Sequence, residues 1–216
     1  ELHAWFNPFR AASLSDTARL SPRHLAKQKP ALTRVFCTQL WFDPAEPEVQ
    51  DQAMSVVRDV LTRYDIDAVH VDDFFYPYPD TRCPNLSFPD SVTYDRYQRG
   101  GGTLDRANWR RDNVNRFVER LYTEVHAQRS FVRVGISPFG IWRPGNPAGI
   151  VGLDAFGSIY ADSRLWLQQG WVDYFAPQLY WSLASSGQNF GALLDWWGQQ
   201  NTRQRHLWPG LAAYRI

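Results

Sequence analysis

Two adjacent carboxylic acids at the end of a short apolar run are the side chains in this sequence best suited to catalysis. Asp72 and Asp73 follow residues 66–71, in which aliphatic side chains alternate with small or polar ones. Such alternation is typical of a β-strand. In a parallel α/β barrel, the carboxyl end of each strand opens onto the active site. Paired carboxyls in that position suit hydrolysis of a glycosidic bond, which needs a proton donor and a group that stabilises positive charge on the sugar.

The roles of the two acids stay open at this stage. Neighbouring strand residues face opposite sides, so both reach one cleft only if the strand ends at Asp73; the alternative is that Asp73 anchors the following loop. Consecutive acids also suit substrate-assisted hydrolysis, in which one acid orients the acetamido group of the sugar and the other protonates the leaving oxygen. Our hypothesis makes Asp72 the proton donor and Asp73 the orienting group.

Two further polar residues deserve comparison with this pair. Asp43 is the remaining acidic candidate, and its alternative role is a turn or helix cap before the helix that begins near residue 47. His70 is expected to fill the barrel interior, from where it could tune the pKa of Asp72. The five histidines show no paired ligand spacing, so we expect no metal and no cofactor.

Composition limits the remaining possibilities. The 216 residues, 44% hydrophobic and 21% charged, predict a single globular domain. A formal net charge of +1 gives no reason to expect a nucleic-acid partner, and no run is long enough to span a membrane. Ten Trp, ten Tyr and thirteen Phe suit either a core or a cleft in which sugar rings stack on flat side chains.

The cysteines and the first residue bear on the protein's context. Cys37 and Cys83 could pair in an oxidising compartment or remain free thiols in a reducing one, and the sequence does not choose between these states. The chain begins at Glu1 and runs directly into a predicted strand. We therefore expect it to be a piece of a longer protein.

Strands and helices alternate along the chain. Predicted strands cover residues 2–7, 66–73, 131–136, 172–181 and 206–214, and predicted helices cover residues 49–64, 109–126, 159–169 and a segment from 190. Regular β/α alternation predicts a parallel sheet with crossover helices. The long segment 77–108 is expected to be a folded loop. Five strands are fewer than the eight of a closed barrel of ~250 residues.

Polar and aromatic side chains at the strand ends complete the predicted site. A helix that follows a strand begins at the same end of a barrel, so its first turns belong there too. The predicted substrate-binding residues are Asn7, Arg10, Tyr76, Arg110, Asn113, Ser137, Phe139, Gln178, Tyr180, Trp181 and Tyr214. Packing at the barrel mouth is the alternative for Gln178 and Trp181.

Six sequence segments together resemble one known family. They read HAWFNPFR at 3–10, YDIDAVHVDDFFYP at 64–77, WRRDNV at 109–114, ISPFGIWR at 136–143, DYFAPQLYW at 173–181 and PGLAAY at 209–214. In order and over nearly the whole chain, they are similar to the glycosyl hydrolase-like 10 family. The resemblance implies an α/β fold of the (β/α)8 TIM barrel type, of which residues 1–216 form a single incomplete domain covering about strands 3 to 7.

The resemblance also implies a function. Members of this family are cell-envelope proteins similar to glycosidases that act on peptidoglycan glycan strands. We therefore expect an extracytoplasmic glycoside hydrolase with a β-linked, N-acetylated polysaccharide as substrate. Arg110 or Arg111 could pair with the carboxylate of a muramic acid residue, with a solvated helix face as the alternative. The rival interpretation is a non-catalytic carbohydrate-binding barrel that keeps the aromatic cleft without a working acid pair.

Overall fold

A parallel five-stranded sheet forms the centre of the fold. The computed structural model describes residues 1–13 and 16–215. The sheet runs in the order β1 (His3–Phe6), β5 (Ala68–Asp72), β6 (Arg133–Ser137), β7 (Tyr174–Phe175) and β8 (His206–Leu207). The helices between successive strands include α2 (Pro47–Arg63), α4 (Arg106–Gln128), α5 (Ala155–Ser158), α6 (Ser163–Gln169) and α7 (Phe190–Gln200). This arrangement confirms the predicted α/β fold with part of a barrel-type parallel sheet.

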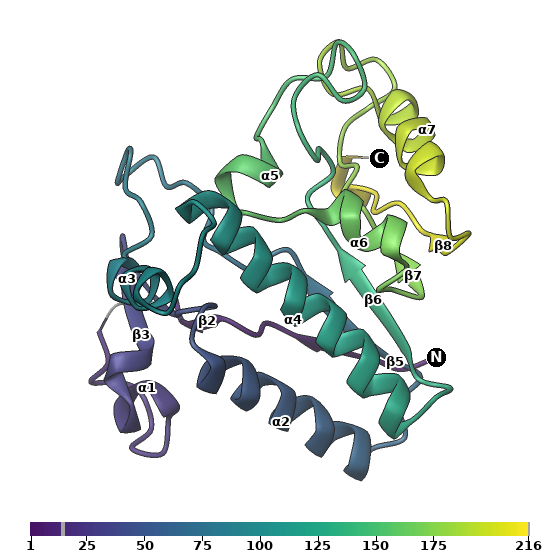
Figure 1. Cartoon of the computed structure of the whole chain (residues 1–216). Helices are drawn as coiled ribbons and strands as arrows, with labels where there is room; N and C mark the ends of the chain where they lie inside the picture. Colours follow the sequence, from purple (N-terminus) through teal and green to yellow (C-terminus); the bar gives the residue numbers. More distant parts are fainter. Residues whose placement is uncertain (14–15, 216) are drawn as a thin grey trace.

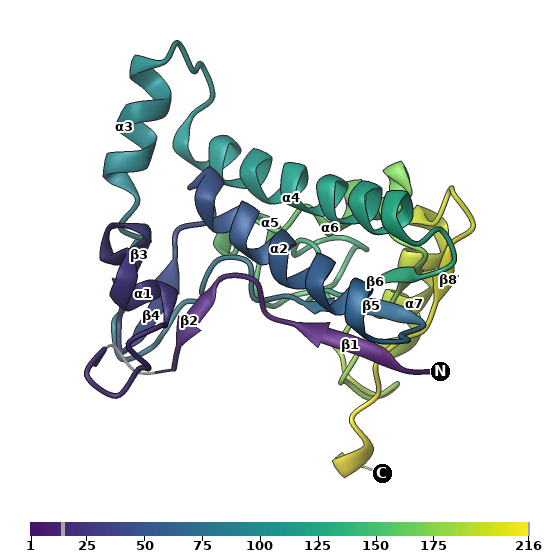
Figure 2. The same ribbon diagram turned by 90° about the horizontal axis from the view of Figure 1, so that it is seen from below.

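Helices α2 and α4 cover one face of the sheet. Figure 1 shows the two helices side by side in front of β1, β5 and β6, and Figure 2 shows them on the same side of the strands from below. The helices bury apolar residues that recur at helical spacing, as predicted: Val49, Val57 and Leu61 in α2, and Val114, Phe117, Val118, Leu121 and Val125 in α4. Val69 and Val71 of β5 are fully buried in the same core. His70 and Asp72 alternate with these valines along β5 and therefore lie on the opposite face, which is the inner face of a barrel.

Several boundaries differ from the predicted ones. β7 covers only two residues, and bridges from Gln178 to Phe139 and Gly210 continue the same strand order after Pro177, which has no N–H to donate. The last strand, β8, is also short. The 3-10 turn η2 (Ala213–Arg215) begins inside the predicted strand range 206–214 and ends one residue after it. α4 begins at Arg106 rather than at 109, since the Asp105 carboxylate accepts the N–H of Asn108 at 2.8 Å and caps the helix.

A small antiparallel sheet and two short helical segments lie beside the main sheet. β2 (Arg10–Ala12), β4 (Gln39–Phe42) and β3 (Thr33–Phe36) form this sheet, preceded by α1 (Leu25–Gln28) and η1 (Pro30–Leu32). The predicted long loop contains α3 (Ser91–Arg99). Both views place α3 next to β3 and α1, away from α7. Within the described residues, none of the helices combines the length and the apolar character needed to cross a membrane.

Gly135 of β6 makes room for an aromatic ring on the inner face of the sheet. It pairs with His70 on one side and Tyr174 on the other, and the Tyr174 hydroxyl lies 2.8 Å from His70 Nδ1 and 2.9 Å from His3 Nδ1. A Cβ at Gly135 would lie 1.8 Å from Cζ of that ring. The ring can shift only by breaking these bonds.

Replacing Gly135 by Ala is therefore expected to lower the free energy of unfolding by about 1–3 kcal/mol, the usual cost of overpacking. Urea denaturation followed by tryptophan fluorescence measures the change. Gly198 in α7 is the matched control, because a Cβ there meets no atom within 4 Å and Ala favours helix. A Gly135→Ala protein as stable as the wild type would contradict the prediction.

Candidate active site

Asp72 lies at the junction of three consecutive strand ends. Its Oδ1 accepts hydrogen bonds from Nε2 of Gln178 at 3.0 Å and from the N–H of Asp73 at 3.2 Å. The same Nε2 donates to the carbonyl oxygen of Ser137 at 3.0 Å. Asp72 and Ser137 are paired in register on β5 and β6, and Gln178 follows β7. The structure therefore brings together Asp72, Ser137 and Gln178, as the strand-end rule predicts.

The carboxyl of Asp72 is half-buried and its pKa is raised. Burial is the main cause, and it outweighs the hydrogen bond from the Asp73 N–H, the charge of Arg10 and a hydrogen bond from Trp5. The guanidinium of Arg10 lies 4.6 Å from the centre of the Phe74 ring. The Asn7 carboxamide oxygen accepts the N–H of Arg10 at 3.1 Å, so Asn7 shapes the turn that places Arg10 at the site.

Asp73 is only 3% exposed and has a higher pKa than a normal carboxyl. Burial and the charge of Asp72 together raise its pKa to about 6, against the hydrogen bond that it accepts from the Tyr78 hydroxyl. Because two neighbouring carboxylates each disfavour the ionisation of the other, the pair titrates as a unit. Below a pH of about 6 the carboxyl of Asp73 therefore keeps a proton beside the carboxyl of Asp72.

An open groove of about 660 Å³ adjoins the pair. Its lining residues are Leu179, Tyr180, Trp181, Ser182, Ser185, Leu211 and Ala212. Burial raises the pKa of Tyr180, and the charges of Asp72 and Asp73 raise it further, so this hydroxyl lies within electrostatic reach of the pair. Tyr214, 79% exposed, adds to the same shift and thus lies near Tyr180.

Aromatic side chains connect the groove to the acids. The Phe139 ring lies 5.8 Å from the Trp181 ring and 6.1 Å from the Tyr78 ring, in both cases edge to face. Flat rings at the side of a groove offer surfaces on which the C–H faces of a sugar can stack, while Gln178 and Tyr180 offer hydrogen bonds. Acid, hydrogen-bonding groups and stacking surfaces thus occur in one place.

Three predicted substrate contacts lie away from this site: Tyr76, expected after the strand of the acid pair, and Arg110 and Asn113, expected there because their helix follows that strand. Tyr76 is fully buried, with its ring 5.2 Å from that of Phe88. Arg110 is 2% exposed, and its Nε and Nη2 donate to the two carboxylate oxygens of Asp90 at 2.6 Å each. Asn113 is 4% exposed and accepts a hydrogen bond from Arg116. Tyr76 and Arg110 are thus closed to a ligand, and Asn113 lines a separate hollow beside α2 and α3.

The remaining candidates have supporting roles. Arg111 lies over the Phe156 ring at 4.0 Å and donates to Asn108, on the side of α4 rather than at the strand ends. Asp43 is fully buried, where it pairs with Arg34 at 2.9 Å. His70 fills the interior as expected, and burial lowers its pKa to about 4, so it is neutral near neutral pH.

Two residues of the site, Trp5 and Tyr78, were not predicted from the sequence. Trp5 is 54% exposed on the inner face, where it donates to Asp72. It lies two residues after His3 and so on the same face of the first strand, a signal that could have identified it. Tyr78 lies between Pro77 and Pro79, shortly after the acid pair. The prolines restrict the backbone here, but no sequence pattern shows that the Tyr78 hydroxyl bonds to Asp73. Among the described residues, no group of three or more His, Cys, Asp or Glu side chains could hold a metal ion.

Known proteins that are similar to this chain include one solved structure and two sequence relatives. The bee venom hyaluronidase structure with a hyaluronic acid tetramer gives a TM-score of 0.49 at 13% identity, over 97% of this chain and 67% of that one. Glycosyl hydrolase YngK of Bacillus subtilis (strain 168) is 39% identical over 224 residues, which are 100% of this chain and 43% of YngK. Glycosyl hydrolase DigH of Escherichia coli (strain K12) is 34% identical over 231 residues, 100% of this chain and 51% of DigH.

The matches cover the whole of this chain but only part of each relative. It spans about half the length of these two relatives. A family model, described as Glycosyl hydrolase-like 10, matches residues 1–216, which is the whole chain. The chain therefore belongs to the glycosyl hydrolase-like 10 family.

Proposed function

We propose that this chain carries the acid pair of a glycoside hydrolase that cleaves β-linked, N-acetylated polysaccharide, with peptidoglycan glycan strands as the expected substrate and an extracytoplasmic location. The observation that carries the proposal is the placement of Asp72: a half-buried carboxyl with a raised pKa, held by Gln178 beside an aromatic groove. A general acid needs a pKa close to the working pH and access to the leaving oxygen. Burial raises the pKa of Asp72 toward that range, and its carboxyl is only partly buried.

The two acids have different exposures and therefore different roles. Asp72 delivers the proton to the glycosidic oxygen as the bond from that oxygen to the anomeric carbon breaks. Asp73, 3% exposed and bonded to Tyr78, acts on Asp72 through its charge and does not contact the sugar. This revises the orienting role assigned to Asp73 from the sequence.

The acetamido group of the substrate supplies the nucleophile in this scheme. Its carbonyl oxygen attacks the anomeric carbon from the face opposite the leaving group, and water then opens the resulting ring. Tyr180, 38% exposed in the groove and close to both carboxyls, is placed to hold that acetamido group. The scheme requires an N-acetylated sugar at the cleavage site, which makes it testable by substrate choice.

The test uses the full-length protein with three glycans. Purified peptidoglycan glycan strands, chito-oligosaccharides and amylose are incubated at pH 4 to 8, and new reducing ends are identified by mass spectrometry. We expect products from N-acetylated, β-linked substrates and none from amylose. Absence of products from every glycan at every pH would overturn the proposal, while cleavage of amylose would overturn the N-acetyl requirement.

Trp181 provides a separate test of substrate binding. Replacing Trp181 by Ala removes a stacking surface worth about 0.5–1.5 kcal/mol, so KM is expected to rise about 2- to 10-fold while kcat stays close to that of the wild type. Trp181→Phe keeps a flat ring and should recover most of the loss. An unchanged KM in the Ala variant would place the sugar elsewhere.

A non-catalytic carbohydrate-binding barrel is the second candidate. The burial of Asp73 favours it, because only one carboxyl of the pair is open to a ligand. Calorimetric binding of chito-oligosaccharide or glycan strands without cleavage at any pH from 4 to 8 would support this candidate over the hydrolase.

A further inference from the structure

Tyr78 connects the acid pair to the loop that follows β5. Its hydroxyl donates a hydrogen bond to Oδ2 of Asp73. Its ring packs edge to face against Phe74, at 6.0 Å, and Phe139, at 6.1 Å. Burial and the charge of Asp73 raise the pKa of the Tyr78 hydroxyl, so it keeps its proton and remains a donor throughout the physiological range. The packing of the Tyr78 ring thus fixes its position, and its hydroxyl donates its hydrogen bond to Asp73.

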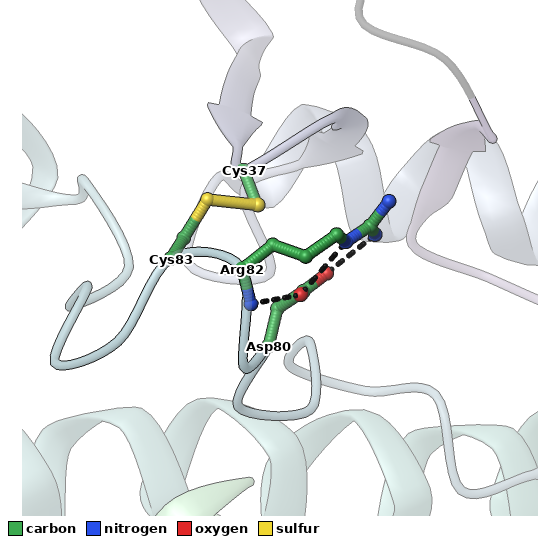
Figure 3. Close-up of a disulfide and its surroundings, with 4 residues drawn as sticks. All are labelled: Cys37, Asp80, Arg82 and Cys83. Atoms are coloured by element: carbon green, nitrogen blue, oxygen red, sulfur yellow. Dashed lines mark hydrogen bonds and ion pairs between the residues drawn. A yellow bond between two sulfur atoms is a disulfide. The ribbon is translucent and has the colours of Figure 1, made fainter.

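The chain on both sides of Tyr78 is restrained. Pro77 and Pro79 flank it and fix their own φ angles. Four residues after Tyr78, Arg82 donates three hydrogen bonds to the Asp80 carboxylate: from its backbone N–H at 2.9 Å, Nε at 3.0 Å and Nη2 at 2.6 Å. These hydrogen bonds close a tight turn directly before Cys83, as Figure 3 shows.

A disulfide fixes this turn to the small antiparallel sheet. Cys83 is bonded to Cys37, which lies in the turn between β3 and β4 and is separated from it by 46 residues in the sequence. The sheet is itself anchored, since Trp41 and Phe36 are buried and Phe36 packs 6.3 Å from Phe88 at the far end of the loop. A cross-link from a loop to a packed element restricts how far the loop can move.

We propose that Tyr78 is a positioning residue of the candidate active site: its hydroxyl holds Asp73 beside Asp72, and the Cys37–Cys83 disulfide fixes the loop that presents it. The inference rests on the proposed function, because the acid pair is the group that Tyr78 serves. Tyr78 is not among the residues that line the groove, and its hydroxyl acts on the substrate through Asp73 and Asp72.

The expected consequence is a change in how the pair holds its proton. A hydrogen bond to an ionised carboxylate favours the ionised form, so the Tyr78 hydroxyl lowers the pKa of Asp73, which stands at about 6 with the bond in place. Removing the hydroxyl raises that pKa. The singly protonated pair then loses its proton at higher pH, and the alkaline limb of the pH–activity profile moves upward while the acid limb changes less.

Carbon-13 NMR of the aspartate carboxyls tests this directly in the full-length protein, without requiring activity. The resonance of Asp73 is assigned by its loss in Asp73→Asn and titrated from pH 3 to 9 in the wild type and in Tyr78→Phe. We expect the midpoint to rise by about one pH unit in Tyr78→Phe. Tyr94→Phe is the matched control, because the Tyr94 hydroxyl bonds to Leu104, in the segment between α3 and α4.

Two further variants keep the test decisive. A fluorinated tyrosine at position 78 is a stronger donor and should lower the Asp73 midpoint, even if Tyr78→Phe folds poorly. The pair of substitutions Cys37→Ser and Cys83→Ser frees the loop and should raise the midpoint by less than Tyr78→Phe does. A midpoint that equals the wild-type value in that double variant would remove the disulfide from the proposal.

The outcomes separate the two proposals. An Asp73 midpoint that is the same in wild type, Tyr78→Phe and the fluorotyrosine protein overturns the role of Tyr78, whatever the activity. A midpoint that rises as expected in a protein that cleaves none of the three glycans supports the Tyr78–Asp73 link and overturns the proposed function. A rise accompanied by an upward shift of the alkaline limb supports both.

Discussion

Replacement of Asp72 by Asn is expected to lower kcat/KM on an N-acetylated glycan by about 10²- to 10⁴-fold, the usual contribution of a general acid. Asn has nearly the shape of Asp and can still accept the hydrogen bonds from Gln178 and from the Asp73 N–H. It cannot donate a proton to the leaving oxygen. The loss should therefore appear in kcat and in kcat/KM together, with KM little changed.

The design of that experiment depends on substrates of graded difficulty. A substrate with an acidic leaving group, such as a nitrophenyl glycoside of N-acetylglucosamine, needs little protonation, so the Asp72→Asn loss should be much smaller on it than on a glycan. Asp95→Asn, on the exposed face of α3, is the matched control and should leave both rates unchanged. An Asp72→Asn protein that keeps more than a tenth of its activity on glycan would exclude Asp72 as the acid.

The core of the candidate site could be predicted because it depends on local rules. Alternation in residues 66–71 fixed which face of the strand Asp72 occupies, and β/α alternation implied that the strand ends at Asp72, Ser137 and Gln178 share one edge of a parallel sheet. Arg10 joins the site for the same reason, since it follows the first strand after a turn. Side chains at the ends of neighbouring parallel strands meet whatever the connecting segments do.

The positions of Tyr76, Arg110 and Asn113 could not be predicted because they depend on the loop. Helical spacing identifies the apolar face of α4, but its first turns are covered by the insertion that carries α3. Asp90, which ends up beside Arg110, lies 20 residues before it in the sequence, and no local pattern marks the two as partners. The loop 77–108, which contains α3, thus covers residues that were predicted to bind substrate, so they lie in the interior.

Loss of the buried ion pair between Arg110 and Asp90 is expected to lower the free energy of unfolding strongly. Asp90 is fully buried and Arg110 is 2% exposed, and Arg110 also donates to the carbonyl of Phe88 at 2.9 Å and to the Tyr160 hydroxyl at 2.6 Å. Replacing Asp90 by Ala leaves the guanidinium buried without its carboxylate. Removing one partner of a buried pair costs about 3–5 kcal/mol, so unfolding by urea should begin at a markedly lower concentration.

Two comparisons test whether the cost comes from the unpaired charge. Asp59→Ala removes an exposed pair with Arg63 on α2 and is expected to leave stability nearly unchanged. The double variant Asp90→Leu with Arg110→Met removes both charges and keeps apolar volume, so it should recover much of the loss. If Asp90→Ala and the double variant are equally unstable, lost packing rather than the buried charge is the cause.

The same substitution also bears on the acid pair, because Asp90 anchors the far end of the segment whose near end holds Tyr78. The disulfide restrains that segment at Cys83 and the ion pair restrains it at Asp90, so each limits the loop at a different point. If the two restraints act independently on Asp73, Asp90→Ala should destabilise the protein while the carbon-13 midpoint of Asp73 stays at its wild-type value below the unfolding transition. A midpoint that rises in Asp90→Ala would mean that the whole loop, rather than its disulfide-bonded half, positions Tyr78.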